Sequence, residues 1–172
     1  MTLDEYLKNT SSKLKARTTC FLIDGDRILL GKKLEGIGKG FYVGIGGKQK
    51  KSESLEETLK RELDEETSVI PVKFEQVATL NFYFIENSKW NQKVYVYLCE
   101  KWKGDPVETS EIKPVWFNIT KIPFDEMWED ALYYLPYVLR RKVVIGDFLY
   151  DGENRVVDSK LDVRLKISST GG

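Results

Sequence analysis

Strand-like segments dominate the pattern of apolar and polar positions along this chain of 172 residues. Short apolar runs rich in β-branched and aromatic side chains, bounded by turn-forming residues, are typical of β-strands. Runs of this kind cover residues 18–23, 27–33, 74–85, 93–102 and 115–119. The first two flank Asp24-Gly25-Asp26, a turn sequence that predicts a β-hairpin. A second hairpin is expected within residues 143–165, with its turn at Asp151-Gly152.

Two segments have the composition of helices. Residues 55–67 are rich in Glu, Leu, Lys and Arg, which favour helix formation, and they follow a serine that can cap the first turn. Residues 125–142 predict a second helix with a bend or break at Pro136, because proline has no N–H to donate. Residues 36–48 contain many glycines, and they predict a loop with a short strand.

The order of these elements, without an internal repeat or a low-complexity linker, predicts one α+β domain. We expect residues 15–168 to form this domain, residues 1–14 an N-terminal arm or short helix, and residues 169–172 a tail. No apolar run reaches the ~18 residues of a membrane span, and the first residues lack the apolar segment of a secretory signal. We therefore expect a cytoplasmic monomer that has no membrane partner.

The chain contains no histidine, and this removes a large part of enzyme chemistry. It excludes Ser-His-Asp triads, Cys-His pairs and zinc sites of the HExxH kind. The two cysteines, Cys20 and Cys99, are too few for a zinc knuckle and lie in apolar runs. We expect buried free thiols of a reducing compartment, with a disulfide as the alternative. Catalysis must then use carboxylates, Lys, Tyr, Ser or Thr, and a bound metal must accept oxygen ligands.

The charges of the chain balance, with 27 Lys plus Arg against 27 Asp plus Glu. A neutral chain is a poor match for long nucleic acid, whose binding depends on the neutralisation of many phosphates. Balanced charge sets no such limit on a small anionic molecule, so a small-molecule substrate is the expected partner.

Three carboxylates lie on one stripe of the first predicted helix. Glu62, Glu65 and Glu66 are spaced at i, i+3 and i+4, and Leu59 and Leu63 place this stripe at the edge of the buried face. Clustered carboxylates repel one another, and a hard divalent cation turns that repulsion into attraction. An all-oxygen ligand set favours Mg²⁺ or Mn²⁺ over Zn²⁺. The alternative is an ordinary acidic helix exposed to solvent.

The carboxylates belong to a longer motif with fixed spacing. Gly47 is followed after five residues by Glu53, after seven more by the run from Arg61 to Glu66, and then by the aliphatic Val69. This pattern resembles the Nudix box, Gly-x5-Glu-x7-Arg-Glu-U-x-Glu-Glu-x-Gly-U, in which U is aliphatic. Every defined position matches except the second glycine, which is Ser68 here. Ser68 falls just past the predicted helix end, where glycine eases a left-handed turn, so the departure concerns stability more than catalysis.

The resemblance implies a Nudix hydrolase, a mixed-sheet α/β/α sandwich that cleaves a diphosphate linked to another moiety. It implies that Mg²⁺, with Mn²⁺ as a substitute, is held by Glu62, Glu65, Glu66 and the backbone carbonyl of Gly46. It also implies an ion pair between Arg61 and Glu53 that fixes the loop after Gly47 to the helix. A carboxylate would orient or deprotonate the attacking water.

The similarity covers roughly residues 18–165 and includes residues 106–117 and 122–136. These segments resemble the branch of the family that hydrolyses oxidised purine nucleoside triphosphates. By this resemblance, Glu111 is a further acid at the metal site. Glu111 and Glu66 are then candidates for activating the water, with Glu65 beside them as a third catalytic carboxylate.

The same resemblance implies a pocket for the base. Trp128 would stack on the purine, Asp130 would hydrogen-bond its edge, and Phe82 and Phe84 would line the pocket. The alternative for these aromatic side chains is packing in the core. Other positions implied to contact the substrate are Thr18, Lys33 and Val43.

Three pocket positions differ from that branch of the family. Val43 stands where an asparagine reads the purine, Ala131 replaces a second aspartate, and Ile37 replaces a phenylalanine. Valine can pack against a base but cannot hydrogen-bond to it, and a missing polar contact can shift substrate choice by orders of magnitude. We therefore expect an intact set of catalytic residues and an altered base preference.

These features predict an Mg²⁺-dependent nucleoside triphosphate diphosphatase that converts oxidised or otherwise modified purine dNTPs to the monophosphate and pyrophosphate. Such an enzyme cleanses the nucleotide pool. One alternative is a Nudix hydrolase for a dinucleoside polyphosphate, ADP-ribose or another nucleoside diphosphate derivative. A second is a non-catalytic sensor that binds a nucleotide, although such a sensor has no need of the complete set of metal carboxylates.

Overall fold

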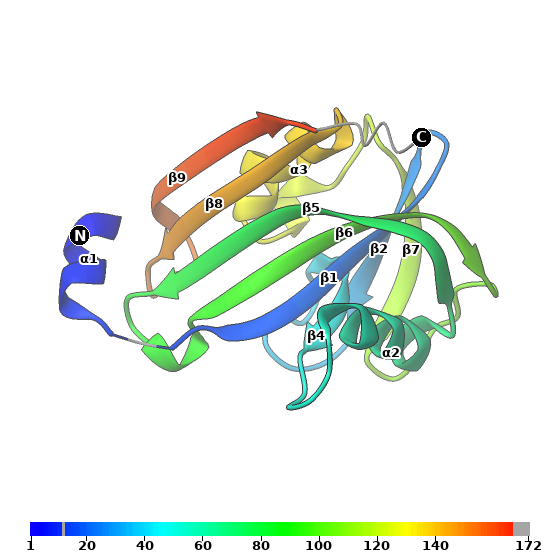
Figure 1. Ribbon diagram of the computed structural model, residues 1–172, viewed down its shortest axis with the longest axis horizontal. Coiled ribbons are helices and arrows are strands. Elements are labelled where there is room, and N and C mark those ends of the chain that lie inside the picture. Colours follow the sequence, from blue (N-terminus) through cyan, green and yellow to red (C-terminus); the bar gives the residue numbers. More distant parts are fainter. Residues whose placement is uncertain (12, 167–172) are drawn as a thin grey trace.

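The computed structural model describes residues 1–11 and 13–166, and over these ranges nine strands join in one sheet (Figure 1). The strands are β1 (Lys15–Asp24), β2 (Arg27–Lys33), β3 (Tyr42–Val43), β4 (Ile45–Lys48), β5 (Ile70–Phe84), β6 (Gln92–Lys103), β7 (Ile112–Asn118), β8 (Lys142–Tyr150) and β9 (Val156–Leu165). The helices are α1 (Leu3–Asn9), α2 (Leu55–Thr67) and α3 (Asp130–Leu139), with 3-10 turns η1 (Ser88–Trp90) and η2 (Phe124–Glu126). The expected tail at residues 169–172 lies outside the described residues.

Strand β1 holds the sheet together because it has partners along its whole length. Residues 15–22 pair in parallel with β6, and residues 17–20 pair on the other side with β4. The last two residues, Ile23 and Asp24, pair with β2, which in turn pairs with β3 and β7. On the far side of β6, strand β5 is antiparallel to β6 and parallel to β8, and β9 closes that edge. The sheet is therefore mixed, as the sequence predicts.

Two apolar layers cover opposite faces of the sheet. Helix α2 buries Leu59 and Leu63 in a cluster with Cys20 and Ile45. Helix α3 contributes Tyr134 and Leu135, among others, to a larger cluster on the other face. Each fully buried leucine contributes roughly 2 kcal/mol of hydrophobic stabilisation. This arrangement is the α/β/α sandwich that the resemblance to the Nudix family implies, with α2 in front of the sheet and α3 behind it (Figure 1).

Helix α2 begins and ends where the sequence predicts. The Ser54 hydroxyl oxygen accepts a hydrogen bond of 3.1 Å from the Glu57 backbone N–H, which caps the first turn. At the other end, Ser68 adopts a left-handed conformation with φ of 60° and ψ of 31°. The Ser68 N–H donates to the Asp64 carbonyl. The predicted strand and hairpin positions are likewise confirmed, with small differences at their ends.

The second predicted helix starts later than expected. Residues 124–126 form the separate turn η2, Met127 is extended, and α3 begins only at Asp130. The Tyr150 hydroxyl on β8 accepts a 3.0 Å hydrogen bond from the Asp130 backbone N–H, and it caps the helix at this point. A cap supplied by a distant strand leaves no mark in the local sequence, so the prediction of a helix from residue 125 is wrong.

The same helix also ends earlier than expected. Arg141 has a left-handed backbone with φ of 62°, which stops the helix, and Lys142 already belongs to β8. Pro136 lies inside α3 and does not break it, since the helix continues to Leu139.

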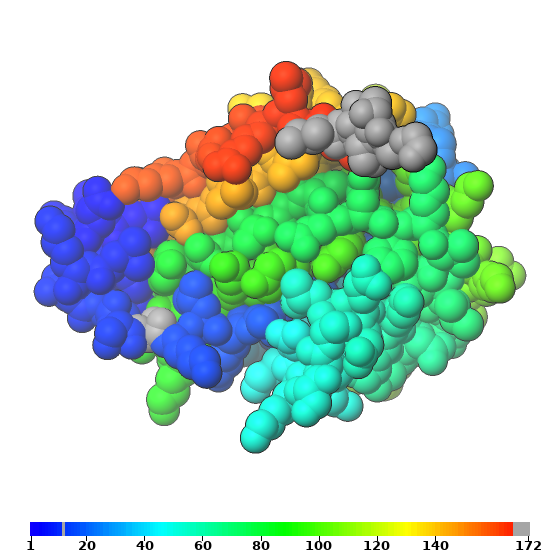
Figure 2. All heavy atoms as spheres, in the orientation of Figure 1, coloured from blue at the N-terminus to red at the C-terminus, as the bar shows by residue number. Residues whose placement is uncertain are grey.

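Both cysteines are free and buried, as expected. Cys20 and Cys99 lie on the neighbouring strands β1 and β6, and burial raises the pKa of the Cys20 thiol well above its usual value. Among the described residues, no helix has the length and apolar character needed to cross a membrane. Figure 2 shows the N-terminal segment, in blue, and the α2 region, in cyan and green, apart on one face with strands exposed between them.

Replacing Ser68 with glycine is expected to raise the free energy of unfolding by about 0.5–1 kcal/mol, because glycine adopts a left-handed φ without strain. Asp64→Gly is the matched control, since this exposed position is helical and glycine there costs about 1 kcal/mol. Urea denaturation followed by circular dichroism measures both changes. Similar destabilisation in the two variants would contradict the left-handed geometry at Ser68.

Candidate active site

A cavity of about 550 Å³ lies beside the middle of the sheet, and it is lined by segments from most of the chain. One face of β1 forms part of its floor through side chains at every second position, Lys15, Arg17, Thr19 and Phe21. Strands β5 and β6 add Leu80, Phe82, Phe84, Gln92 and Val94. Glu66 and Gly46 lie at one end of this lining, and residues from the loop before α3 complete it. The cavity therefore joins the carboxylate helix to an aromatic region.

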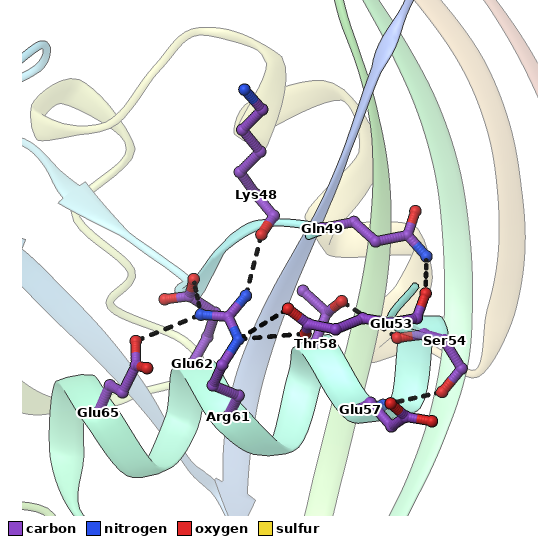
Figure 3. A network of polar contacts seen from close by, with 9 residues as sticks. All are labelled: Lys48, Gln49, Glu53, Ser54, Glu57, Thr58, Arg61, Glu62 and Glu65. Atoms are coloured by element: carbon purple, nitrogen blue, oxygen red, sulfur yellow. Dashed lines mark hydrogen bonds and ion pairs between the residues drawn. The ribbon is translucent and has the colours of Figure 1, made fainter. Parts of the chain in front are cut away.

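The Arg61 side chain organises the carboxylate end (Figure 3). Its Nε atom donates to both carboxylate oxygens of Glu53, at 3.0 and 3.1 Å. One terminal nitrogen donates to Glu62 at 2.8 Å and to Glu65 at 3.2 Å, and the other donates to the Lys48 carbonyl at 3.0 Å. The ion pair between Arg61 and Glu53 that the motif implies is thus present, and it fixes the loop to α2.

Gly47 is required by the packing of strand β4 against Glu62. A Cβ atom at Gly47 would lie only 2.4 Å from the Glu62 Oε1 atom, far inside van der Waals contact. Gly46 is equally constrained, because a Cβ there would lie 1.9 Å from the Thr18 carbonyl oxygen on β1. The glycine of the motif therefore lets the β4 backbone approach the carboxylates closely.

Glu66 is the most perturbed carboxylate at this end. Burial raises the pKa of Glu66 to about 8, and the negative charges of Glu62 and Glu111 add to the shift. The Gly46 backbone amide and the Arg17 guanidinium oppose it. Within residues 1–11 and 13–166, the buried Glu66 Oε2 atom has no hydrogen-bond partner. Such an atom carries a desolvation cost that a bound cation or donor would remove.

The other predicted carboxylates occupy different environments. Glu62 is mostly buried against Arg61, whereas the Glu65 side chain is 56% exposed and forms an ion pair with Arg61. Glu111 is exposed at the start of β7, and with Glu66 and Lys33 it lines a smaller recess of about 230 Å³. The structure therefore places Glu62 and Glu111 close enough to Glu66 for their charges to act on it, and it turns Glu65 outward.

The residues of this end fit an oxygen-liganded divalent cation in their chemistry. Glu66 offers a buried oxygen without a partner, and the neighbouring carboxylates Glu62 and Glu111 make the spot strongly negative. In the part of the chain that is described, no three metal-ligating side chains converge on one point. Arg61 accounts for this spread, because it holds Glu62 and Glu65 by hydrogen bonds of its own.

Aromatic side chains form the opposite end of the cavity. Phe82 stacks on Phe148 with ring centroids 5.5 Å apart, and Phe84 stacks on Tyr150 at 5.3 Å. Both phenylalanines belong to the main core and also line the cavity. Core packing and a position at the pocket therefore do not exclude each other for these two residues. Trp128 is half-buried and meets Tyr150 edge to face at 5.8 Å. Its ring borders the cavity from the loop before α3.

Asp130 is a buried carboxyl group at the same end. Its Oδ1 atom accepts a very short hydrogen bond from the Tyr150 hydroxyl, which in turn accepts the Asp130 N–H. Burial raises the pKa of Asp130 to about 7, although the Tyr150 hydrogen bond opposes the shift. Burial and the Asp130 charge also raise the pKa values of Tyr150 and Tyr134. Asp130 can therefore present either a donor or an acceptor near neutral pH.

The remaining predicted substrate positions belong to the cavity lining. Thr18 is buried, and its hydroxyl has no partner among the described residues. Val43 on β3 lines the wall, Lys33 lies between this cavity and the smaller recess, and Ile37 is exposed at the mouth. Burial and the Arg17 charge lower the pKa of Lys33. Ala131 lines the cavity beside Asp130 without offering a polar atom.

The sequence prediction missed a set of basic side chains around the cavity. Besides Lys33, the lining contains Lys15, Arg17, Lys48 and Lys89. Within the described part of the chain, none of these five side chains takes part in an ion pair. The two-residue alternation of β1 predicts that Lys15 and Arg17 lie on the same face of the strand. It does not predict which face borders a cavity.

The substitution Asp130→Asn is expected to remove a pH dependence of stability. In the wild-type protein, Asp130 keeps its proton up to about pH 7, whereas an unfolded aspartate releases it near about pH 3.9. The free energy of unfolding therefore falls as the pH rises between these values, by a few kcal/mol at most. The contribution of Glu66 is common to both proteins and cancels in their difference. Urea denaturation between about pH 4.5 and 8 measures the difference in the free energy of unfolding between the two proteins. A difference that does not change with pH would contradict the raised pKa of Asp130.

Comparisons with known proteins agree with the motif. The NUDIX domain matches residues 13–138. The chain is 34% identical over 148 residues to the oxidized purine nucleoside triphosphate hydrolase of Danio rerio, covering 86% of this chain and 94% of that protein. The protein of the same name from Mus musculus is 31% identical over 144 residues, covering 84% and 92%.

A solved structure shows the same fold. The MutT protein from Bacillus halodurans superposes with a TM-score of 0.78 at 24% identity, covering 87% of this chain and 98% of that chain. The domain match spans most of the chain, and the two sequence relatives exceed 30% identity over more than two thirds of their length. The chain therefore belongs to the NUDIX family and has the Nudix hydrolase fold.

Proposed function

We propose that this Nudix hydrolase converts oxidised or otherwise modified purine nucleoside triphosphates to the monophosphate and pyrophosphate, and so cleanses the nucleotide pool of the cytoplasm. The observation that carries the proposal is one cavity with a carboxylate and basic end at Glu66 and an aromatic end at Trp128 and Asp130. The relatives from Danio rerio and Mus musculus bear the name of this activity.

The charge of the cavity supports a polyanionic substrate. Five basic side chains without ion-pair partners in the described part of the chain line a cavity that contains the two acids Glu66 and Asp130. The raised pKa values of these two acids reduce their negative charge near neutral pH. The cavity therefore attracts a phosphate chain although the protein as a whole is neutral.

The carboxylates would hold Mg²⁺, with Mn²⁺ as a substitute. The proposed ligands are Glu62, Glu65, Glu66, Glu111 and the backbone carbonyl of Gly46. When bound, the ion supplies the positive charge that neutralises the phosphate oxygens. The structure favours Glu62, Glu66 and Glu111 for this role, because the charges of Glu62 and Glu111 act on Glu66, whereas the Glu65 side chain is 56% exposed.

The remaining steps belong to side chains of this protein. Arg17, Lys33 and Lys48 are placed to hold the phosphate chain near the carboxylates. We assign to Glu66 the acceptance of the proton from the attacking water, with Glu111 as the second candidate and Glu65 further away. The Glu66 Oε2 atom is the one that lacks a hydrogen-bond partner within residues 1–11 and 13–166, so it is available for this contact.

The aromatic end would bind the base. Trp128 would stack on a purine, and Phe82 and Phe84, which line the same cavity, would pack against the base. The protonated Asp130 carboxyl can donate a hydrogen bond to a purine acceptor, and its ionised form can accept one from a purine N–H. Thr18 offers a hydroxyl, whereas Val43 offers only packing. This combination supports a base preference that differs from that of relatives with an asparagine at this position.

A hydrolysis panel tests the proposed function. With Mg²⁺ present, we expect pyrophosphate release from modified purine dNTPs such as 8-oxo-dGTP, 2-hydroxy-dATP or O6-methyl-dGTP, at higher kcat/KM than from the four ordinary dNTPs. Chromatography of the nucleotide product together with a pyrophosphate assay distinguishes this cleavage from loss of the terminal phosphate. Activity confined to ADP-ribose or diadenosine polyphosphates would contradict the assignment of the base pocket.

The substitution Glu66→Gln is expected to lower kcat by about 10²- to 10⁴-fold, because it removes the proposed proton acceptor. The variant should unfold at the same temperature as the wild-type protein or higher, because glutamine avoids the cost of a buried charge. Asp64→Asn on the exposed side of α2 is the matched control and should keep wild-type kinetics. Near-normal turnover in Glu66→Gln would contradict the placement of the catalytic site.

The substitution Val43→Asn is expected to raise the ratio of kcat/KM for 8-oxo-dGTP over dGTP by about tenfold, because the amide adds a donor and an acceptor to the pocket wall. Val43→Thr has nearly the volume of valine and lacks the amide, so this control should leave the ratio close to the wild-type value. Steady-state kinetics on both nucleotides measure the ratio. An unchanged ratio in Val43→Asn would refute the placement of Val43 beside the base.

A further inference from the structure

Helix α1 is anchored at the end of the sheet where β5 finishes (Figure 1). Leu3 and Tyr6 are buried in a small cluster with Tyr83 and Leu149. The Leu3 N–H donates to the Asp158 carboxylate on β9 at 2.8 Å. A capping box between Thr2 and Glu5 closes the first turn of the helix. The helix is therefore docked by apolar contacts and by a hydrogen bond to a strand, which a loose arm lacks.

The Tyr6 hydroxyl takes part in a closed ring of three buried hydrogen bonds. It donates to the Phe84 carbonyl oxygen at 3.2 Å and accepts from the Asn91 side-chain amide at 3.0 Å. The Asn91 side-chain oxygen accepts the Phe84 backbone N–H at 2.8 Å, which closes the ring. Hydrogen bonds in such a buried ring reinforce one another, and the loss of one leaves a buried partner unsatisfied. Tyr6 thereby ties the last residue of β5 to the end of the connection between β5 and β6.

The residues tied by this ring carry the aromatic end of the cavity. Phe84 lines the cavity, and so do Trp90 and Gln92 on either side of Asn91. Trp90 meets Phe84 edge to face at 5.8 Å. The Asn91 carbonyl oxygen accepts the Lys15 N–H at 3.4 Å, and Lys15 is a further lining residue. A shift of Asn91 or of the Phe84 backbone would therefore move several parts of the same cavity wall.

Tyr6 itself does not line the cavity. Its ring packs against Tyr83 with centroids 5.8 Å apart, and Tyr83 points to the opposite side of β5 from Phe84. The Tyr6 hydroxyl acts on a ligand through its hydrogen bonds to the backbone of Phe84 and the side chain of Asn91. This separation allows the hydroxyl to be removed without touching the ligand.

We infer that Tyr6 is a positioning residue for the base-binding wall, and that helix α1 serves base recognition by holding Phe84, Trp90 and Gln92 in register through Asn91. The inference depends on the proposed function, since it takes the aromatic end of the cavity as the place of the base. It also gives a role to residues 1–9, whose sequence carries no motif. Phosphate binding at the carboxylate end does not depend on this ring of hydrogen bonds.

The test compares the binding of two ligands to Tyr6→Phe by isothermal titration calorimetry. We expect the affinity for 8-oxo-dGMP, which occupies the base end, to fall about three- to tenfold, the range that follows from the loss of one buried hydrogen bond. The affinity for pyrophosphate in the presence of Mg²⁺ should stay unchanged. With 8-oxo-dGTP as substrate, KM should rise while kcat changes little.

Tyr83→Phe is the matched control, because it removes a hydroxyl from the same cluster that makes no hydrogen bond within the described ranges of the chain. This variant should bind both ligands as the wild-type protein does. Suppose that the wild-type protein binds 8-oxo-dGMP. An unchanged affinity of Tyr6→Phe for this nucleotide, or an equal loss of affinity for both ligands, would then overturn the inference. Failure of the wild-type protein to bind any purine nucleotide would instead overturn the proposed function and this inference with it.

Discussion

The Arg61 guanidinium fixes the position of several carboxylates near the cavity, those of Glu53, Glu62 and Glu65. It bonds to Glu53 in the loop, to Glu62 and Glu65 on its own helix, and to the carbonyl of Lys48 at the end of β4. A single planar cation thus joins a strand end, a loop and a helix, with a geometry that lysine could not reproduce. Because the network is largely shielded from water, it stabilises this arrangement more than isolated surface ion pairs would.

The two ends of the cavity share a physical property, since each contains a carboxyl group whose ionisation the fold disfavours. Glu66 and Asp130 both have pKa values raised mainly by burial. Such groups reduce the stability of the protein at neutral pH, so packing elsewhere in the fold must compensate for them. Their partners differ, because Glu66 faces other carboxylates whereas Asp130 faces the Tyr150 hydroxyl. Under the proposed function, this difference distinguishes the end that would hold a cation from the end that would hold the base.

The sequence by itself determined most of the fold and the identity of the carboxylate helix. The strands, both hairpins and the bounds of α2 follow from local patterns, because alternation, turn residues and capping act over a few neighbours. The fixed spacing from Gly47 to Val69 identified the family and the pairing of Arg61 with Glu53. These relations could be predicted because loop and helix are adjacent in the chain.

Only the tertiary structure decided the features that join distant segments. The start of α3 depends on the Tyr150 hydroxyl of β8, so the local pattern placed it five residues too early, at 125 instead of Asp130. The basic lining from Arg17 to Lys89 and the docking of α1 through Tyr6 likewise depend on contacts between segments far apart in the chain. A sequence records which side chains are present. Packing between segments far apart in the chain decides which of these side chains are buried, which find a hydrogen-bond or ion-pair partner, and which remain unpaired.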